Sequence, residues 1–330
     1  MRIGFSLALI GLAALMASPR PAAADDYPTR NITFLVPFAP GGGTDVLARI
    51  VGQKMEQRLG KSLIVENRPG AGTTIAAGAT AKAAPDGYTL MQATSGTMAM
   101  NPTIFKTLPY TPEKDLVPVS LIAGVPFVLV VHPDLHVKSV ADLVKLAKER
   151  QAQGKPLTYG SGGVGAFHHL NAELFSSMTG IKMTHVPYKG SVPSMTALIA
   201  HEIDVLFVDI GPSIQLIRAG KARALGLTSA EPVASAPEIQ PLSKVGLPGF
   251  DTTAWQMIVA PGGVPKPILE KLNKDANASV NDPEVHKKLS DMGMIPLGKK
   301  SLPELDAFIK SETAKWAPVI KNAGLAGSQG

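Results

Sequence analysis

Two glycine-rich segments follow expected strands and precede expected helices, where they could bind an anion. The first is 41–43, followed by Thr44, and the second is Gly163-Val164-Gly165. Glycine lets a backbone approach a ligand closely, and a helix start presents N–H donors without intrahelical partners together with a partial positive charge. The two segments therefore predict binding of a small anion. A tight turn without any ligand is the alternative for the first segment.

Neither segment has the pattern of a nucleotide site. The first lacks the Gly-Lys-Ser/Thr ending of a P-loop, and the third glycine of a dinucleotide fingerprint is replaced by Val46 in the first segment and by His168 in the second. Two helix entrances on separate units favour a clamp over a single catalytic pocket. We therefore expect the two entrances to face each other when the units close.

Patterns for catalysis and for metal binding are weak. The chain has no cysteine, which excludes disulfides and thiolate chemistry. The Gly-x-Ser-x-Gly pattern of a hydrolase is absent around Ser95 and Ser161, although paired carboxylates for glycosidase chemistry are not excluded by sequence. Neighbours on a helix such as His168 and His169 point about 100° apart, and His169 with Glu173 lacks a third ligand nearby in sequence. We predict no catalysis, no metal and no cofactor.

The first 24 residues have the composition of a cleaved signal peptide. Arg2 is followed by an apolar run from 3 to 17 and by the small residues 22–24. This run is shorter than the roughly 20 residues that a membrane span needs. A retained anchor is the alternative. Because the chain has no cysteine for lipid attachment, we expect a free periplasmic protein of a Gram-negative bacterium.

The remaining 306 residues exceed the roughly 250 to 300 at which one core stops growing, so we expect two lobes. Without residues 1–24, which carry Arg2 and Arg20 and no acid, the formal charge is 30 minus 26, or +4. The basic residues are scattered and only 5% of residues are aromatic, so we predict no nucleic-acid partner. A mild positive field favours anionic ligands.

The elements that position these segments alternate between strands and helices, which predicts an α/β fold with parallel sheets. Expected strands are 32–36, 62–66, 88–94, 117–131, 157–160, 181–186, 205–208, 223–228 and 255–260. Ligands of such sheets bind at the carboxyl ends of the strands. The long strand 117–131 has the length to leave one lobe and enter the other, and 255–260 would return.

Capping residues mark several expected helices. Ser139 and Asp282 stand at helix starts, and Ser301 with Glu304 forms a capping box. In the helix that ends near residue 59, apolar side chains repeat every four residues and predict one buried face. Pro318 should kink or shorten the last helix.

Four strings in order resemble one family across essentially the whole chain after residue 24. They are VPFAPGGGTD at 36–45, VENRPGAG at 65–72, APDGYTL at 84–90 and HVPYKG at 185–190. Together they resemble the tripartite tricarboxylate transporter receptors, known as the Bug family. The resemblance implies a type II periplasmic binding protein fold, whose two lobes close on a carboxylated solute. It also implies delivery to a two-subunit membrane permease.

From this resemblance we expect lobe 1 to comprise 25–124 and 229–330, lobe 2 to comprise 125–228, and the protein to be a monomer. In the family the first loop, here 38–43, receives a carboxylate partly through ordered waters, and matching positions lie in later loops of both lobes. The expected ligand-binding residues are Phe38, Pro40, Gly41, Gly42, Gly43, Thr94, Thr97, Ser161, Gly163, Gly165, Phe167, His168, Tyr188 and Asp209.

The sequence departs from its relatives where they often carry Thr or Ser, because Ala166 and Phe167 stand there. The lost hydroxyl groups predict an apolar or aromatic wall, which suits an aromatic or longer aliphatic acid better than citrate. Asp209 could instead accept a hydrogen bond from an amino or hydroxyl group of the solute. The alternative function is presentation of the ligand to a membrane sensor kinase, which the same residues would serve.

Overall fold

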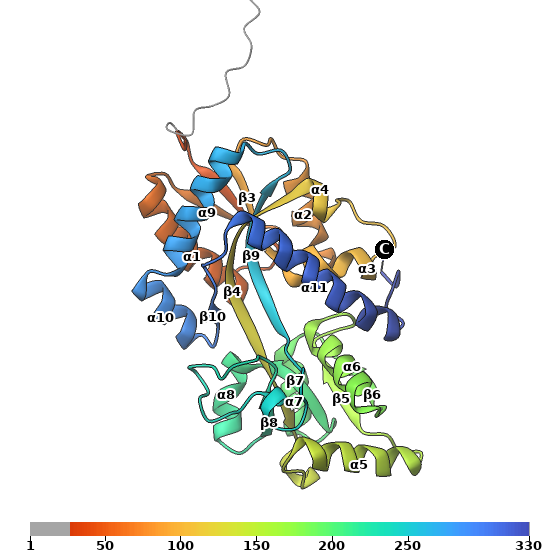
Figure 1. The fold of residues 1–330 in the computed structure, drawn as a ribbon. Coiled ribbons are helices and arrows are strands. Elements are labelled where there is room, and N and C mark those ends of the chain that lie inside the picture. The colour runs from red at the N-terminus through yellow and green to blue at the C-terminus, as the bar shows by residue number, and fades with distance from the viewer. Residues whose placement is uncertain (1–26, 330) are drawn as a thin grey trace, which may run out of the picture.

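The computed structural model describes residues 27–329 and arranges them in two α/β lobes joined by two long strands (Figure 1). These strands are β4 (Leu116–Val131) and β9 (Thr253–Pro261). Within the described residues, no helix combines the length and the apolar character that crossing a membrane requires. The expected signal peptide, 1–24, lies outside the described residues.

Lobe 1 is built on three parallel strands. β1 (Ile32–Val36) lies between β2 (Leu63–Asn67) and β3 (Thr89–Thr94), and β3 pairs in the antiparallel sense with β9. Helix α1 (Gly43–Leu59) buries the predicted face of Leu47, Val51, Met55 and Leu59 against this sheet. The carboxyl ends of β1 and β3 therefore open toward lobe 2, as the alternation of elements predicted.

Strand β4 belongs to both lobes. Its first part, up to Pro126, pairs with β9, and its second part, from Phe127, pairs with β7 (Val205–Asp209) and β8 (Arg223–Leu227). β7 in turn is followed by β5 (Thr158–Ser161) and β6 (Thr184–Pro187). The two expected crossovers are thus present. The boundaries proposed at 124/125 and 228/229 stay predictions.

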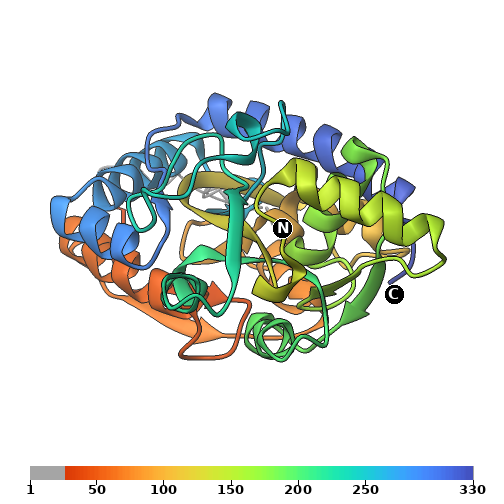
Figure 2. The same ribbon diagram turned by 90° about the horizontal axis from the view of Figure 1, so that it is seen from below.

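Helices and short turns cover both sheets (Figures 1 and 2). The remaining elements are η2 (Ala71–Thr73), α2 (Thr74–Ala81), η3 (Gly96–Met100), α3 (Asn101–Ile104), α4 (Pro112–Asp115), η4 (Pro133–Leu135), α5 (Val140–Ala152), α6 (Phe167–Thr179), α7 (Ser191–Ile199), α8 (Ile210–Arg218), η5 (Leu242–Lys244), α9 (Lys266–Val280), α10 (Pro283–Asp291), β10 (Ile295–Pro296) and α11 (Leu302–Asn322). The C-terminal helix α11 runs from lobe 1 to α6 of lobe 2, where Trp316 packs edge-on against Phe167 at a centroid distance of 4.9 Å.

The helix caps predicted from sequence are confirmed. The side chain of Ser139 accepts a hydrogen bond from the Asp142 N–H, that of Asp282 accepts from the Glu284 N–H, and Ser301 with Glu304 forms the capping box. The expectation that Pro318 shortens the last helix is wrong, because α11 continues to Asn322. Trp316 and Ile320 on either side are completely buried, and their packing outweighs the loss of one backbone hydrogen bond.

Candidate functional site

A cavity of about 320 Å³ lies where the two lobes meet, within the size range of small-molecule sites. Its walls come from the start of α1, the middle of β4, the start of α8, the middle of β9 and the loop after α10. The lining residues are Gly43, Thr44, Val125, Phe127, Asp209, Gly211, Pro212, Ala254, Gln256, Met292, Gly293 and Met294. No lysine or arginine is among them.

The start of α1 forms the wall from lobe 1. Gly42 is the N-cap of this 17-residue helix, and no side chain caps it. The N–H groups of Gly43 and Thr44 have no acceptor within the helix, because they belong to its first turn. Together with the positive end of the helix dipole, these donors suit a carboxylate. The placement of Gly43 agrees with the first predicted loop.

Asp45 fixes the loop that precedes α1. This carboxylate is 3% exposed, accepts two hydrogen bonds from Arg49 at 3.0 Å each, and accepts one from Asn67 at 2.9 Å. Asn67 also donates to the Phe38 carbonyl. The hydrogen bonds from Arg49 are the main reason that the pKa of Asp45 falls to about 2. The side chain therefore stays ionised and holds the loop in shape.

One backbone N–H group of the first loop, that of Gly41, already has a hydrogen-bond acceptor within the protein. The Gly41 N–H donates to Asp45 Oδ2 at 3.0 Å, so in this conformation Gly41 shapes the loop and its N–H is not free for a ligand. Gly41 has φ of +85°, a left-handed backbone that glycine adopts without strain. Phe38, Pro40 and Gly42 lie in the same exposed loop. Their contact with a solute stays a prediction.

The start of α8 and Asp209 form the opposite wall. Asp209 ends β7 and accepts a hydrogen bond from Ser191 Oγ at 2.6 Å, and Ser191 Oγ is also 2.9 Å from His168 Nε2. Burial lowers the pKa of His168, which favours the neutral imidazole at neutral pH. His168 does not line the cavity. It is connected to the lining residue Asp209 through the hydroxyl group of Ser191.

The second glycine loop, Ser161–Gly165, is not among the residues that line this cavity, and the start of α8 lines it from lobe 2. That the two glycine loops face each other when the lobes close stays a prediction. Two histidine side chains of lobe 2 contact the second loop. Ser161 Oγ lies 2.6 Å from His185 Nε2, and the Gly165 N–H donates to His169 Nδ1 at 3.1 Å. A side chain on Gly165 would come within 3.4 Å of Ile104 in lobe 1. Gly165 thus lies at a contact between the lobes.

The four remaining predicted residues differ in how deeply they are buried; they are Thr94, Thr97, Phe167 and Tyr188. Thr97 is completely buried and bonds the hydroxyl groups of Thr73 and Thr94, so it positions Thr94 at the end of β3. Phe167 packs against Phe127, with ring centroids 5.5 Å apart, and so supports the cavity wall from behind. Tyr188 is half-buried in lobe 2, and its carbonyl oxygen would lie 3.9 Å from a Cβ on Gly163.

Sequence reasoning missed the contribution of β9. Gln256 lines the cavity and is 8% exposed, and its Oε1 accepts a hydrogen bond from Gln92 Nε2 at 3.3 Å. Gln92 Oε1 is buried without a partner in the structure. The sequence does contain a signal for this contact. Gln92 and Gln256 stand in otherwise apolar strands, and a buried side-chain amide needs a hydrogen-bond partner. The cavity lining therefore combines polar groups, among them Asp209 and Gln256, with the apolar side chains of Val125, Phe127 and Met292.

Comparisons with known proteins agree with this architecture. The sequence model of the tripartite tricarboxylate transporter family receptor matches residues 47–325. A UPF0065 protein from the tcbD–tcbE intergenic region of Pseudomonas sp. strain P51 is 35% identical over 316 residues, which are 95% of this chain and 92% of that protein. Protein BugT of Bordetella pertussis is 33% identical over 323 residues, which are 98% and 96% of the two chains.

Solved structures with bound carboxylates are also similar. Rpa4515 of R. palustris with adipate has a TM-score of 0.78 and 37% identity, covering 91% of this chain and 99% of that one. MatC of Rhodopseudomonas palustris with malate has a TM-score of 0.74 and 30% identity, covering 89% and 100%. The fold is thus that of the two-lobe periplasmic binding proteins. The resemblance seen in the four strings is confirmed, and the chain belongs to the tripartite tricarboxylate transporter receptor family.

Proposed function

We propose that this protein captures a small carboxylate in the cavity between its lobes and delivers it to a two-subunit membrane permease. The observation that carries the proposal is the uncapped start of α1 at the cavity wall, where Gly43 and Thr44 offer backbone N–H groups. Because no cationic side chain lines the cavity, these amides are the donors best suited to an anion. The similar proteins solved with adipate and malate support a carboxylate ligand.

The lining favours a carboxylate with an apolar body. Val125, Phe127 and Met292 line the cavity, and the Phe167 ring packs at a tilt of 32° against that of Phe127. At the far end, the start of α8 offers amides to a second carboxylate, whereas Asp209 accepts a hydrogen bond from a hydroxyl or amino group. Citrate carries three carboxylates and would place charge against the apolar wall, so we expect it to bind more weakly than an aromatic or longer aliphatic acid.

Thermal unfolding with a panel of acids tests the ligand class. The protein without residues 1–24 would be measured with adipate, benzoate, malate and citrate, and the Kd values would be confirmed by calorimetry. A ligand at 100 times its Kd adds about 2.7 kcal/mol of stability. We expect adipate or benzoate to give the largest shift. If citrate stabilises the protein more than both, the apolar-body assignment is wrong.

Two substitutions at Gly43 test the role of the α1 start. Gly43→Pro removes one N–H at the first helical position, where proline fits, and Gly42 already has the extended backbone that precedes proline, with φ −75° and ψ 163°. We expect affinity for the carboxylate to fall by about tenfold or more, as for a lost hydrogen bond to a charged group. The melting temperature without ligand should change little.

Gly43→Ala is the matched control, because it keeps the N–H. Its Cβ would lie 3.8 Å from the Met294 methyl group, an ordinary contact. We expect Gly43→Ala to retain the affinity within a small factor. Equal loss in both variants would show that crowding, and not a missing donor, caused the effect. Unchanged affinity in Gly43→Pro would place the carboxylate elsewhere.

A deletion strain tests delivery. Loss of uptake of the radiolabelled acid, restored by the wild-type chain, is expected for a transport receptor. If uptake is intact and only induction of transport genes is lost, the protein presents its ligand to a sensor. Incubation of the pure protein with the acid, followed by NMR, should return the acid unchanged, as expected for a receptor that performs no catalysis.

A further inference from the structure

A cluster of two histidines and a carboxylate lies at the end of lobe 2 that faces away from the cavity. β4 and β7 run antiparallel: Phe127 pairs with Asp209 at the cavity end, and Val131 pairs with Val205 at the other end. His132 directly follows β4, five residues beyond Phe127. At roughly 3.3 Å per strand residue this is about 17 Å along the strand. The cluster is therefore separate from the carboxylate site.

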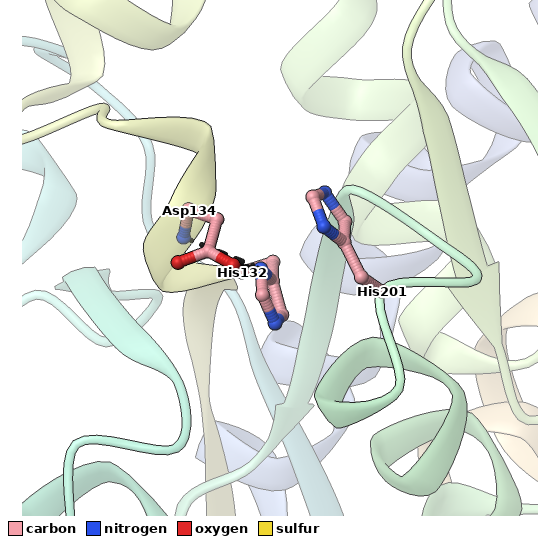
Figure 3. Close-up of side chains that lie close together, drawn as sticks. All are labelled: His132, Asp134 and His201. Carbon is pink, nitrogen blue, oxygen red and sulfur yellow. Dashed lines mark hydrogen bonds and ion pairs between the residues drawn. The ribbon is translucent and has the colours of Figure 1, made fainter.

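Within residues 27–329, His132, Asp134 and His201 form a group whose metal-ligating atoms all lie within 4.8 Å of one another. In the close-up of Figure 3, His132 lies between the carboxylate of Asp134 and the ring of His201. The two imidazole rings stack at a centroid distance of 3.9 Å and an interplanar angle of 14°. Asp134 Oδ2 is 3.9 Å from His132 Nδ1. Three side chains thus bring potential metal-ligating atoms close together.

The backbone that carries these side chains is tied together. The His132 N–H donates to the Asp204 carbonyl at 3.2 Å, which joins the end of β4 to the segment that leads into β7. The Asp134 N–H donates to His132 Nδ1 at 3.2 Å. Asp204 Oδ2 accepts from the N–H and hydroxyl groups of Thr158. These bonds hold the two histidine-bearing segments at a fixed separation.

Asp204 adds a second carboxylate near His201. Its Oδ1 lies 3.9 Å from His201 Nε2, longer than a hydrogen bond. A carboxylate that accepts a hydrogen bond from the ring nitrogen that does not bind the metal is a common partner of a metal-binding histidine, because it orients the ring. Asp204 could take this role once the His201 ring turns.

The backbone at His201 is left-handed, with φ of +56°, a conformation that is uncommon outside glycine but several-fold enriched in histidine, asparagine and aspartate. Its side chain is 40% exposed, which leaves room for the ring to turn. This freedom matters, because stacked parallel rings point their nitrogen lone pairs in parallel and one ring must turn before both can bind one ion.

We propose that His132, Asp134 and His201 bind one divalent transition-metal ion, with Asp204 orienting His201. Two imidazoles and a carboxylate suit zinc, nickel or copper, whereas magnesium and calcium prefer oxygen ligands alone. A bound ion would join the end of β4 to the α7–β7 connection and so stabilise lobe 2. It would leave the carboxylate cavity unobstructed.

Calorimetry with metal salts tests the proposal on chelator-treated protein that carries no histidine tag. Zinc chloride, nickel chloride and copper chloride would be titrated in a buffer that binds no metal, with magnesium chloride and calcium chloride as controls. We expect one zinc, nickel or copper ion per chain and a raised melting temperature, with no heat from magnesium or calcium. Absence of saturable one-to-one binding by all three transition metals would overturn the proposal.

Matched variants locate the site. His201→Asn removes the imidazole and keeps a residue that accepts the left-handed backbone. His136→Asn is the control, because His136 also has a left-handed φ, of +57°, and lies in the neighbouring turn outside the cluster. We expect His201→Asn and Asp134→Asn to weaken metal binding by about tenfold or more, and His136→Asn to leave it unchanged. Equal binding by the His201 and His136 variants would overturn the assignment.

Carboxylate affinity provides a second readout in the same variants. Because the cluster lies at the far end of β4 and β7, His201→Asn should leave the Kd for the carboxylate unchanged while metal binding is lost. Failure of metal binding would therefore not affect the proposed receptor function, and failure of carboxylate binding would not affect the metal site.

Discussion

The two glycine loops are held in opposite ways. The loop before α1 is exposed and is fixed by one ionised carboxylate, Asp45, which binds Gly41, Arg49 and Asn67. The Ser161–Gly165 loop is instead contacted by two imidazoles, those of His185 and His169. The carboxylate of Asp45 stays ionised at the pH values at which proteins usually work, whereas the pKa of His185 is lowered, chiefly by burial.

The surroundings of the second loop explain this difference. The His185 ring stacks with that of His169 at a centroid distance of 4.0 Å and with that of Tyr159 at 4.9 Å, and the Tyr159 and His169 rings lie 6.0 Å apart. Glu173 accepts a hydrogen bond from Tyr159 and lies 3.7 Å from His169. Burial first, and the neighbouring His169 second, lower the pKa of His185 to about 4. The charged form of His185 is therefore disfavoured in the folded protein.

The largest effect should come from removing the charged support. Asp45→Ala removes a buried carboxylate whose partner Arg49 is half-exposed, and leaves the Gly41 N–H and the Asn67 amide without this acceptor. We expect a loss of about 2 kcal/mol in the free energy of unfolding, mainly from the unpaired donors, and weaker carboxylate binding because the loop before α1 is no longer fixed. Urea denaturation and calorimetry measure the two quantities.

The matched control for Asp45→Ala is Asp291→Ala, which removes an ion pair with Lys287 on the surface of α10. Both side chains of that pair are largely exposed, so the free energy of unfolding should change by about 0.5 kcal/mol or less. If the two variants are equally stable, the hydrogen bonds and the ion pair of Asp45 do not fix the loop before α1.

The second effect is a pH dependence of the free energy of unfolding that comes from His185. Between about pH 6.5 and pH 4, the unfolded chain binds a proton on His185 that the folded chain does not, because 6.5 is the ordinary pKa. The stability from this group is therefore complete above about pH 6.5 and falls as the pH decreases toward 4. Asp45, whose pKa is lowered from 3.8 to about 2, loses its contribution only below about pH 5, where the unfolded carboxyl begins to bind a proton.

The comparison of wild type with His185→Gln isolates this contribution. Between pH values near 7 and near 5, the wild type should lose about 1 kcal/mol more unfolding free energy than the variant, after allowance for solvent screening of a half-buried ring. Urea denaturation at the two pH values measures it. An equal loss in both proteins would show that another group titrates.

The smallest effect concerns the loop at the end of β3, which neither support touches. Thr97→Val keeps the shape of a completely buried side chain but removes the hydroxyl that bonds Thr73 and Thr94. We expect a loss of about 1 kcal/mol in unfolding free energy. Loss of carboxylate affinity beyond that of a matched Thr80→Val variant, whose hydroxyl bonds only the Ala76 carbonyl, would place Thr94 in contact with the ligand.

Local signals in the sequence were sufficient for most elements. The spacing of Leu47, Val51 and Met55, together with the caps at Ser139 and Asp282, predicted helices because each depends on neighbours within four residues. The long strand β4 was predicted by its length. Pro318 does not shorten α11, because its local cost is outweighed by packing of the completely buried Trp316 and Ile320; a kink at Pro318 stays a prediction.

The cavity was harder to predict because its walls depend on distant pairing. Gln256 reaches it only because β9 lies between β3 and β4. Helix α8 was missed, since Gly211-Pro212 directly after β7 has the composition of a turn and no side chain caps the helix. As a result, the sequence did not indicate that the start of α8 lines the cavity.

A crystal structure of the protein with a bound carboxylate tests the central claim most directly. We predict a carboxylate oxygen about 3 Å from the N–H of Gly43 or Thr44, with the rest of the ligand against Phe127 and its far end between Asp209 and Gln256. A carboxylate held only by the Ser161–Gly165 loop or by a lysine or arginine side chain, with the start of α1 facing solvent, would contradict the account.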